Sequence, residues 1–310
     1  MILPELTREA AVNILVNTSS VVEGGAALLA HGKMMAALVG VISLLHQPSP
    51  KLGAPRSIEM VGAGSMAIKA VANILATDPE RGVPALMECK GIDVVAKAIS
   101  ATHDSEDGRR HAAELLGIVC STRAGEEELL RLGAHRMLLM MLLEPGVSIR
   151  DFVDREAAGL DHFFLEEGQG KEHQAARRPT PVQEATLCAL RALSGCPRGR
   201  GVLQKELTPR WIRVLSAFTT WDSPTAVEDA CAIICNIAQS SQGQKRILEC
   251  PGAVLRLIAV LHISVYTKLG WGGPAYACGA LGNLALSEDG ALSLMEHVAH
   301  VPLAALLHSV

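Results

Sequence analysis

The residues of this chain that come closest to a chemical motif are two glycines and an alanine. In "IEMVGAGSMAIKAVANIL", Gly62, Gly64 and Ala67 spell G-x-G-x-x-A ahead of a helical pattern. In a dinucleotide-binding fold such a turn follows a strand and lets the backbone approach a pyrophosphate at a helix N-terminus. The preceding stretch 58–61 is short for a strand. A nucleotide-binding enzyme built around this turn is nevertheless one interpretation of the chain.

Thiols and imidazoles offer little further chemistry. Cys231 and Cys235 lie one helical turn apart, but neither a second cysteine pair nor a histidine stands at the spacing of a structural zinc site. We expect His297 and His300 to be solvated rather than to form a ligand pair. The sequence contains no phosphate-binding G-x-x-x-x-G-K-[ST] motif and no G-x-S-x-G motif. These patterns predict no catalytic residue, no metal site, no cofactor and therefore no enzyme.

A repeated phrase is the strongest pattern in the sequence. "CNIAQSSQG" at 235–243 recurs as "GNLALSEDG" at 282–290. With the Asn of this phrase as an anchor, small or aliphatic residues recur six, three and two positions before it and one position after it. These positions share one face of a helix with 3.6 residues per turn. The pattern is anchored on Asn13, Asn73, Ile118, Ala192, Asn236 and Asn283.

A second helical pattern follows each anchor. An apolar pair, usually a Gly, and another apolar run come next, as in "LLRLGAHRMLLMMLL" and "ILECPGAVLRLIAVL". Aromatic residues make up 3% of the chain and AVILMFWYC residues 49%, a composition that favours packed helices over sheets. Successive anchors lie 60, 45, 74, 44 and 47 residues apart. Three of these spacings are close to an armadillo or HEAT unit.

The two long spacings predict insertions. The first, at about 47–64, includes "QPSPKLGAPRS" and is typical of a loop. The second, at about 144–181, contains an amphipathic helix with an apolar stripe and acidic residues on its other face. That helix packs on its own repeats, acts as a detachable partner-binding element or as a self-ligand of the groove, or is disordered. The apolar residues that could bind the partner are Phe152, Leu160, Phe163 and Phe164.

The repeats resemble the armadillo family over essentially the whole chain. Its third helix typically reads A-x-x-A-L-x-N-I/L-A, which "ACAIICNIA" at 230–238 and "ACGALGNLA" at 277–285 match closely. The resemblance implies an all-α fold, a right-handed superhelical solenoid of three-helix repeats. It would form one domain over residues 1–310, with about five complete repeats and partial repeats at both ends. Because no polar cap is evident, we expect either a longer array or a partner that covers the ends.

The resemblance also implies a function. Third helices of the family line a concave groove, where the anchor Asn binds the backbone of an extended ligand. That role falls on Asn13, Asn73, Asn236 and Asn283, unless these residues only bridge neighbouring helices. We therefore predict a non-enzymatic protein-interaction scaffold that binds an extended peptide or a partner helix in the groove.

Other residues near the anchors refine this expectation. Importin-α-like members place Trp four residues before the Asn, where this chain has Glu9, Lys69, Glu114, Cys188, Ala232 and Gly279. Binding of nuclear localisation signals is therefore not expected. A β-catenin-like groove uses basic residues, for which Arg110 and Arg191 are candidates. Glu184, Glu228 and Asp229 lie near the same surface, so its charge is mixed.

Bulk properties narrow the class of partner. A net charge of -4 and a pI near 6.3 give no electrostatic footprint for nucleic acid. Met34 to Gln47 is too short to span a membrane, and Gly270 to Ser287 is interrupted by glycines, so no membrane insertion is expected. Eight cysteines without a disulfide-framework spacing favour the cytosol or nucleus. A third interpretation is a structural protein that self-associates through its uncapped ends.

Overall fold

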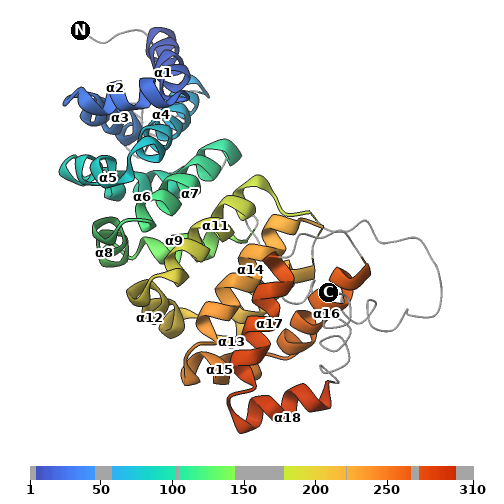
Figure 1. Cartoon of the computed structure of the whole chain (residues 1–310). Helices are drawn as coiled ribbons and strands as arrows, with labels where there is room; N and C mark the ends of the chain where they lie inside the picture. The colour runs from blue at the N-terminus through green and yellow to red at the C-terminus, as the bar shows by residue number, and fades with distance from the viewer. Residues whose placement is uncertain are drawn as a thin grey trace, which may run out of the picture. The chain divides into compact units, whose positions relative to one another are not determined.

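All regular structure in the described part of the chain is helical (Figure 1). The computed structural model describes residues 5–45, 58–101, 105–143, 178–220, 222–266 and 272–297. By their contacts the residues divide into two compact units. Unit 1 comprises Met1–Met141 and Pro181–Leu193, and unit 2 comprises Leu142–Thr180 and Ser194–Val310. The sequence predicts one domain, and the two units are described separately below.

Unit 1 is built from helices in the predicted order. The lone first helix is α1 (Glu5–Ser19), and three groups of helices follow it. These are α2 (Val22–Ala30), α3 (Met34–Ser43) and α4 (Ile58–Thr77); then α5 (Pro79–Glu88), α6 (Gly91–Ala101) and α7 (Glu106–Cys120); then α8 (Arg123–Arg131), α9 (Ala134–Met141) and α11 (Pro181–Gly195), whose last two residues belong to unit 2.

Unit 2 continues the same order. Its helices are α12 (Pro197–Glu206), α13 (Pro209–Ala217) with the short 3-10 helix η1 (Phe218–Thr220), and α14 (Pro224–Ile237); then α15 (Ser241–Leu248), α16 (Ala253–Tyr266) and α17 (Gly272–Leu284); and finally α18 (Glu288–Glu296). Asn73, Asn236 and Asn283 therefore lie on the third helix of their groups and Asn13 lies on the lone helix α1, as the repeat pattern predicts.

Third helices stack on one another within each unit. In unit 1, α4 packs against both α1 and α7, and in unit 2, α14 packs against α17 (Figure 1). The small residues that the pattern places six positions before the anchor are fully buried in these contacts. They are Ala67, Ala112, Ala230 and Ala277, each 0% exposed. A side chain of one methyl group lets neighbouring helix backbones approach closely, so the small-residue face is confirmed.

The repeated phrase ends on Gly because two backbones meet there. Ser240 caps α15, with its Oγ accepting a hydrogen bond from Gly243 N at 3.1 Å. A Cβ on Gly243 would lie 2.0 Å from the Ile237 carbonyl oxygen at the end of the preceding helix. Gly290 occupies the same position after the Ser287 cap, and a Cβ on it would lie 2.0 Å from the Leu284 carbonyl oxygen. The tight turn between repeats therefore requires a residue without Cβ.

Glycines between first and second helices have a different role. Gly133 and Gly252 have φ values of +69° and +81°, the left-handed conformation that ends many helices. In the "CKG" turn the positive φ, 55°, falls on Lys90 instead. A Cβ on Gly91 would lie 2.1 Å from Leu86 Cδ1. Gly91 is therefore required because the Leu86 side chain leaves no room for a Cβ, and not because of its backbone conformation.

The predicted loop at 47–64 is wrong at its C-terminal end, because α4 already begins at Ile58. Gly64 was placed in a turn, yet it lies inside α4, where a Cβ would be 2.4 Å from Leu45 Cγ. Gly62 and the fully buried Ala67 belong to the same helix. Residues 58–61, which the nucleotide-binding interpretation requires to be a strand, are the first turn of α4. That interpretation therefore fails. The motif reflects close packing of α4 against the end of α3.

The apolar helices also bear on membrane spanning. Among the described residues, no single helix is both long and apolar enough to cross a bilayer, while Arg8–Ser19 and Val22–Ala30 together reach that length but are bent by 118° at their break.

Candidate functional site

The exposed sides of the third helices are the first candidate site. We call the anchor position, together with the position four residues before it, the third-helix face. In unit 1 this face contains Glu9 and Asn13 on α1, Lys69 and Asn73 on α4, Glu114 and Ile118 on α7, and Cys188 and Ala192 on α11. In unit 2 it contains Ala232 and Asn236 on α14, and Gly279 and Asn283 on α17.

The anchor Asn side chains bridge consecutive third helices. Asn73 Nδ2 donates to Ser19 Oγ on α1 at 3.2 Å. In unit 2, Asn236 Nδ2 donates to Ser194 Oγ at 3.0 Å, and Asn283 Nδ2 donates to the Cys235 carbonyl oxygen at 3.3 Å. These contacts establish the bridging role that the sequence left as the alternative to ligand binding.

Bridging does not use the whole carboxamide. In all three bridges the amide nitrogen is the donor, and within the described residues the carbonyl oxygen Oδ1 accepts no hydrogen bond. Asn73, Asn236 and Asn283 are half-buried, as is Asn13 on α1. A carboxamide provides two donors and an acceptor oxygen, so one side chain can bridge helices and still accept a bond from a ligand.

Unit 1 gathers charged side chains around a buried histidine. His111 is 3% exposed. Arg110 Nη2 lies 3.0 Å from His111 Nε2 and 3.2 Å from Asp107 Oδ1. Because a guanidinium can only donate, His111 Nε2 must accept, and the imidazole is neutral. Burial, followed by the positive charges of Arg110 and Lys69, lowers the pKa of His111 to about 4.

Glu114 and Lys69 are the charged members of the third-helix face beside this cluster. Glu114 is an exposed residue, although neighbouring protein atoms remove enough water from its carboxyl that burial raises its pKa. The positive charges of Arg110 and Lys69 act in the opposite direction on that pKa without overcoming burial. Within the part of the chain that the structure describes, neither Glu114 nor Lys69 forms a salt bridge or a side-chain hydrogen bond.

Unit 2 has small, uncharged residues at the corresponding positions. Ala232 is 1% exposed, and a Cβ on Gly279 would lie 2.9 Å from Cys235 Sγ. Asn283 Nδ2 lies 4.0 Å from the same sulfur. Burial raises the pKa of both Cys231 and Cys235. Both thiols are therefore protonated, and Cys235 fills space between α14 and α17.

Metal chemistry finds no support in these side chains. No group of three or more His, Cys, Asp or Glu side chains that could hold a metal ion lies within the described ranges. Of the remaining predicted groove residues, Arg191 lies half-buried on α11. The predicted partner-binding residues Phe152, Leu160, Phe163 and Phe164 fall outside the described residues, so that prediction stays open.

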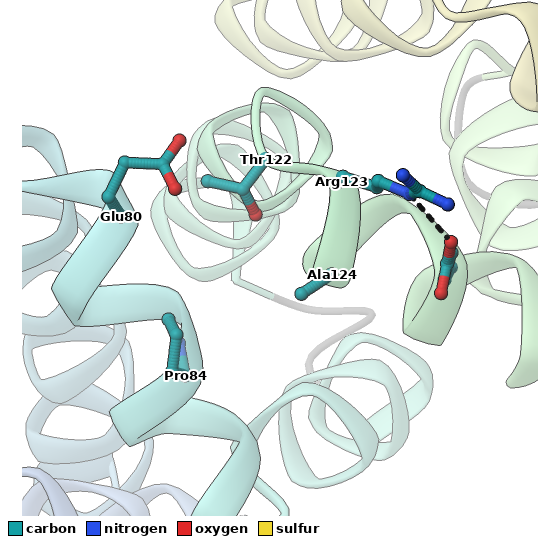
Figure 2. Close-up of a pocket in the computed structure, with 6 residues that line it drawn as sticks. Glu80, Pro84, Thr122, Arg123 and Ala124 are labelled. Carbon is teal, nitrogen blue, oxygen red and sulfur yellow. Dashed lines mark hydrogen bonds and ion pairs between the residues drawn. The ribbon is translucent and has the colours of Figure 1, made fainter.

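A pocket on the first helices of unit 1 is the second candidate site (Figure 2). It has a volume of about 450 Å³ and lies between α5 and α8. Glu80 and Pro84 project from α5, while Thr122, Arg123 and Ala124 stand at the start of α8. Arg123 Nε donates to Glu127 Oε1 at 3.2 Å, a pair that is largely exposed. Solvated pairs of this kind contribute little to binding.

Sequence reasoning missed the charge cluster and the pocket for different reasons. The spacing of the anchors places Lys69 and Glu114 at the same position of consecutive repeats. Their opposite charges at this position are the sequence signal that could have indicated the charge cluster. The buried contact between Arg110 and His111 has no such signal, because adjacent residues on a helix usually point in different directions. The pocket joins residues of two repeats whose types follow no repeat pattern.

Comparisons with known proteins concern the fold. No protein-family model matches the chain, and no curated protein matches it. Among solved structures, an engineered protein matches with a TM-score of 0.62 and 17% identity, over 91% of this chain and 92% of its own.

Designed armadillo repeat proteins match over a similar length. One, in complex with the peptide (KR)4, has a TM-score of 0.60 and 16% identity, over 89% of this chain and 92% of its own. Another, from a set computationally designed for modular peptide recognition, has a TM-score of 0.60 and 17% identity, over 88% of this chain and 92% of its own. The chain has the armadillo-repeat solenoid fold.

Proposed function

We propose that the chain is a non-enzymatic protein-binding scaffold whose third-helix faces bind an extended peptide or a partner helix. The observation that carries this proposal is the repeated anchor Asn on α4, α14 and α17, whose nitrogen bridges two helices while its carbonyl oxygen accepts no bond from any residue that the structure describes. The shared fold with designed proteins made to recognise peptides supports the same function.

The chemistry of such a site is backbone recognition. Each Oδ1 would accept a hydrogen bond from a main-chain N–H of the ligand, which requires no particular ligand side chain. The bridge to the preceding helix fixes the carboxamide orientation before the ligand arrives, which lowers the entropic cost of binding. In unit 2, the half-buried Gly279 would let a ligand backbone approach closely because it has no side chain, whereas Ala232 is buried beneath this face.

The ionisation and burial of the cysteine and histidine side chains described above also favour a scaffold over an enzyme. The thiols of Cys231 and Cys235 have raised pKa values, and His111 is buried with a lowered pKa. None of these groups has the exposure and ionisation of a nucleophile or general base at neutral pH. All eight cysteines are free, which supports our further proposal of a cytosolic or nuclear location.

A displayed library of random peptides, followed by affinity measurements on the selected sequences, tests the groove. The double variant Asn236→Ala/Asn283→Ala should bind the selected peptides about tenfold more weakly, because each lost hydrogen bond is worth about 0.5–1.5 kcal/mol. Lys245→Ala on α15 is a matched control outside the third-helix face and should bind as the wild type does.

Circular dichroism and thermal melting of each variant separate lost binding from lost structure. Equal affinity of the wild type and the double variant, with both folded, would exclude these Asn side chains as ligand contacts. Failure to select any peptide would contradict the proposed function itself.

A further inference from the structure

The strongest unexplained feature of the molecule is a pair of opposite charges on neighbouring third helices that do not neutralise each other. Lys69 on α4 and Glu114 on α7 occupy the same position of consecutive repeats. Each is close enough to affect the electrostatics of the same cluster, because Lys69 influences the pKa of both His111 and Glu114. Nevertheless, within the described residues no salt bridge joins Lys69 and Glu114.

Arg110 would be the obvious partner for Glu114, since the two lie four residues apart on α7. Its guanidinium is turned elsewhere. Nη2 donates to Asp107 Oδ1 and to the neutral His111 Nε2. His111 is buried, so this acceptor is fixed in place. Arg110 is thereby held away from Glu114, and the Glu114 carboxylate has no counter-charge in contact.

Both charges are available to a ligand in the free protein. Glu114 is crowded by protein atoms, so it loses part of its hydration without gaining a partner. Lys69 is half-buried and equally without a partner in the described ranges. A ligand that carries a cation for Glu114 and an anion for Lys69 would restore both interactions at once. A ligand with charges of one sign would meet repulsion at one of the two positions.

We propose that Lys69 and Glu114 form a two-point charge reader for a bound peptide segment that carries one acidic and one basic side chain in close succession. Lys69 binds the carboxylate of the segment, and Glu114 binds its Lys or Arg. The inference rests on the proposed function, because it requires the segment to lie across the third-helix face of unit 1. It names the side-chain chemistry that the backbone-binding Asn residues alone do not select.

An array of ten-residue peptides tests the reader. Each peptide carries one Asp and one Lys on an Ala and Gln background, in either order and one to four positions apart. The wild type should prefer one order by about threefold to tenfold, the size expected for partly exposed charge pairs. The charge-swap variant Lys69→Glu/Glu114→Lys should reverse that preference, because the direction of the bound chain stays the same while the two charges exchange places.

Two controls keep the outcomes distinct. Lys245→Ala on α15 lies outside the third-helix face and should leave the order preference unchanged. Glu114→Gln keeps the size of the side chain, so it should abolish the preference without unfolding even if the charge swap proves unstable. The same order preference in wild type and swap, or none in wild type while library-selected peptides still bind, would overturn the reader and leave the proposed function standing. Absence of all peptide binding would instead remove the proposed function.

Discussion

The two units share one helical framework but present different third-helix faces. In unit 1 the position four residues before the anchor carries Glu9, Lys69, Glu114 and the uncharged Cys188, whereas in unit 2 it carries only Ala232 and Gly279. The buried surface behind it also differs, since unit 1 holds the neutral His111 and unit 2 holds the protonated thiol of Cys235. The repeat pattern thus fixes the spacing of helices, while the positions it leaves free set the chemistry of each face.

Substitutions in the shared framework should have the largest effect, and the same effect in both units. Gly125→Ala in unit 1 would place a Cβ 2.2 Å from the Val119 carbonyl oxygen, and Gly243→Ala in unit 2 would place one 2.0 Å from the Ile237 carbonyl oxygen. Backbone must move in each case, so each variant should lose about 2–3 kcal/mol in chemical denaturation.

Two other glycines provide the matched control for this prediction. A Cβ on Gly40 or Gly282 would have no neighbour within 4 Å among the described residues, and both lie inside helices. Gly40→Ala and Gly282→Ala should therefore gain about 0.5–1 kcal/mol. A loss at Gly125 without a comparable loss at Gly243 would mean that the two units do not share the turn described above.

Acid should weaken unit 1 selectively. The folded pKa of His111 is about 4 and its reference value is 6.5, so the unfolded chain binds more protons between those values. The contribution of the neutral His111 to the stability of the folded state is complete above pH 6.5, declines as pH falls, and is lost below pH 4. By pH 5 the loss should reach about 2 kcal/mol. Glu114 contributes in the opposite direction, because its pKa is raised.

Hydrogen exchange at pH 7 and pH 5 measures this difference helix by helix. Amides of α4 and α7 should lose protection at pH 5 relative to amides of α14 and α17. His111→Gln keeps an acceptor beside Arg110 and removes the titrating group, so its protection in unit 1 should depend less on pH. If α14 and α17 lose protection equally, His111 is not the cause.

Sequence periodicity was sufficient for the framework but not for the contacts of individual atoms. It placed the anchors Asn73 and Asn236 on third helices, because helical spacing and the small-residue face can be read along the chain. It could not identify Ser19 and Ser194 as the acceptors of their amide groups, because those contacts depend on the register between two helices.

The G-x-G-x-x-A stretch shows a second limit. Glycine is required both in turns and where a neighbouring side chain leaves no room for Cβ, and the sequence does not distinguish the two. Only the position of Leu45 against Gly64 does so. The same ambiguity placed the end of the first predicted loop at 64 instead of before Ile58.

Removing an Asn bridge between third helices should lower the free energy of unfolding by an intermediate amount, similar in both units. Asn73→Ala and Asn236→Ala each delete one hydrogen bond between third helices. Ser194 is 0% exposed and Ser19 3% exposed, so water replaces the lost donor poorly. We expect a loss of about 1 kcal/mol for each variant in thermal or urea unfolding. A much larger loss at one site would indicate that its bridge also positions neighbouring side chains.

Gly279→Ala should have the smallest effect on stability, and it compares the third-helix faces of the two units most directly. In unit 2, Gly279→Ala would place a Cβ 2.9 Å from Cys235 Sγ, and because a thiol can shift, the cost should be at most about 1 kcal/mol. In a Cys235→Ala background the sulfur is gone, and the same substitution should become neutral or stabilise the helix by a few tenths of a kcal/mol. A double-mutant cycle measures this energetic coupling between positions 235 and 279.

In unit 1 the corresponding residues Lys69 and Glu114 already project side chains, so Lys69→Ala or Glu114→Ala should relieve no clash. A coupling near zero between positions 235 and 279 would mean that the third-helix face of unit 2 has room for a side chain. Its Gly would then reflect chance rather than close packing.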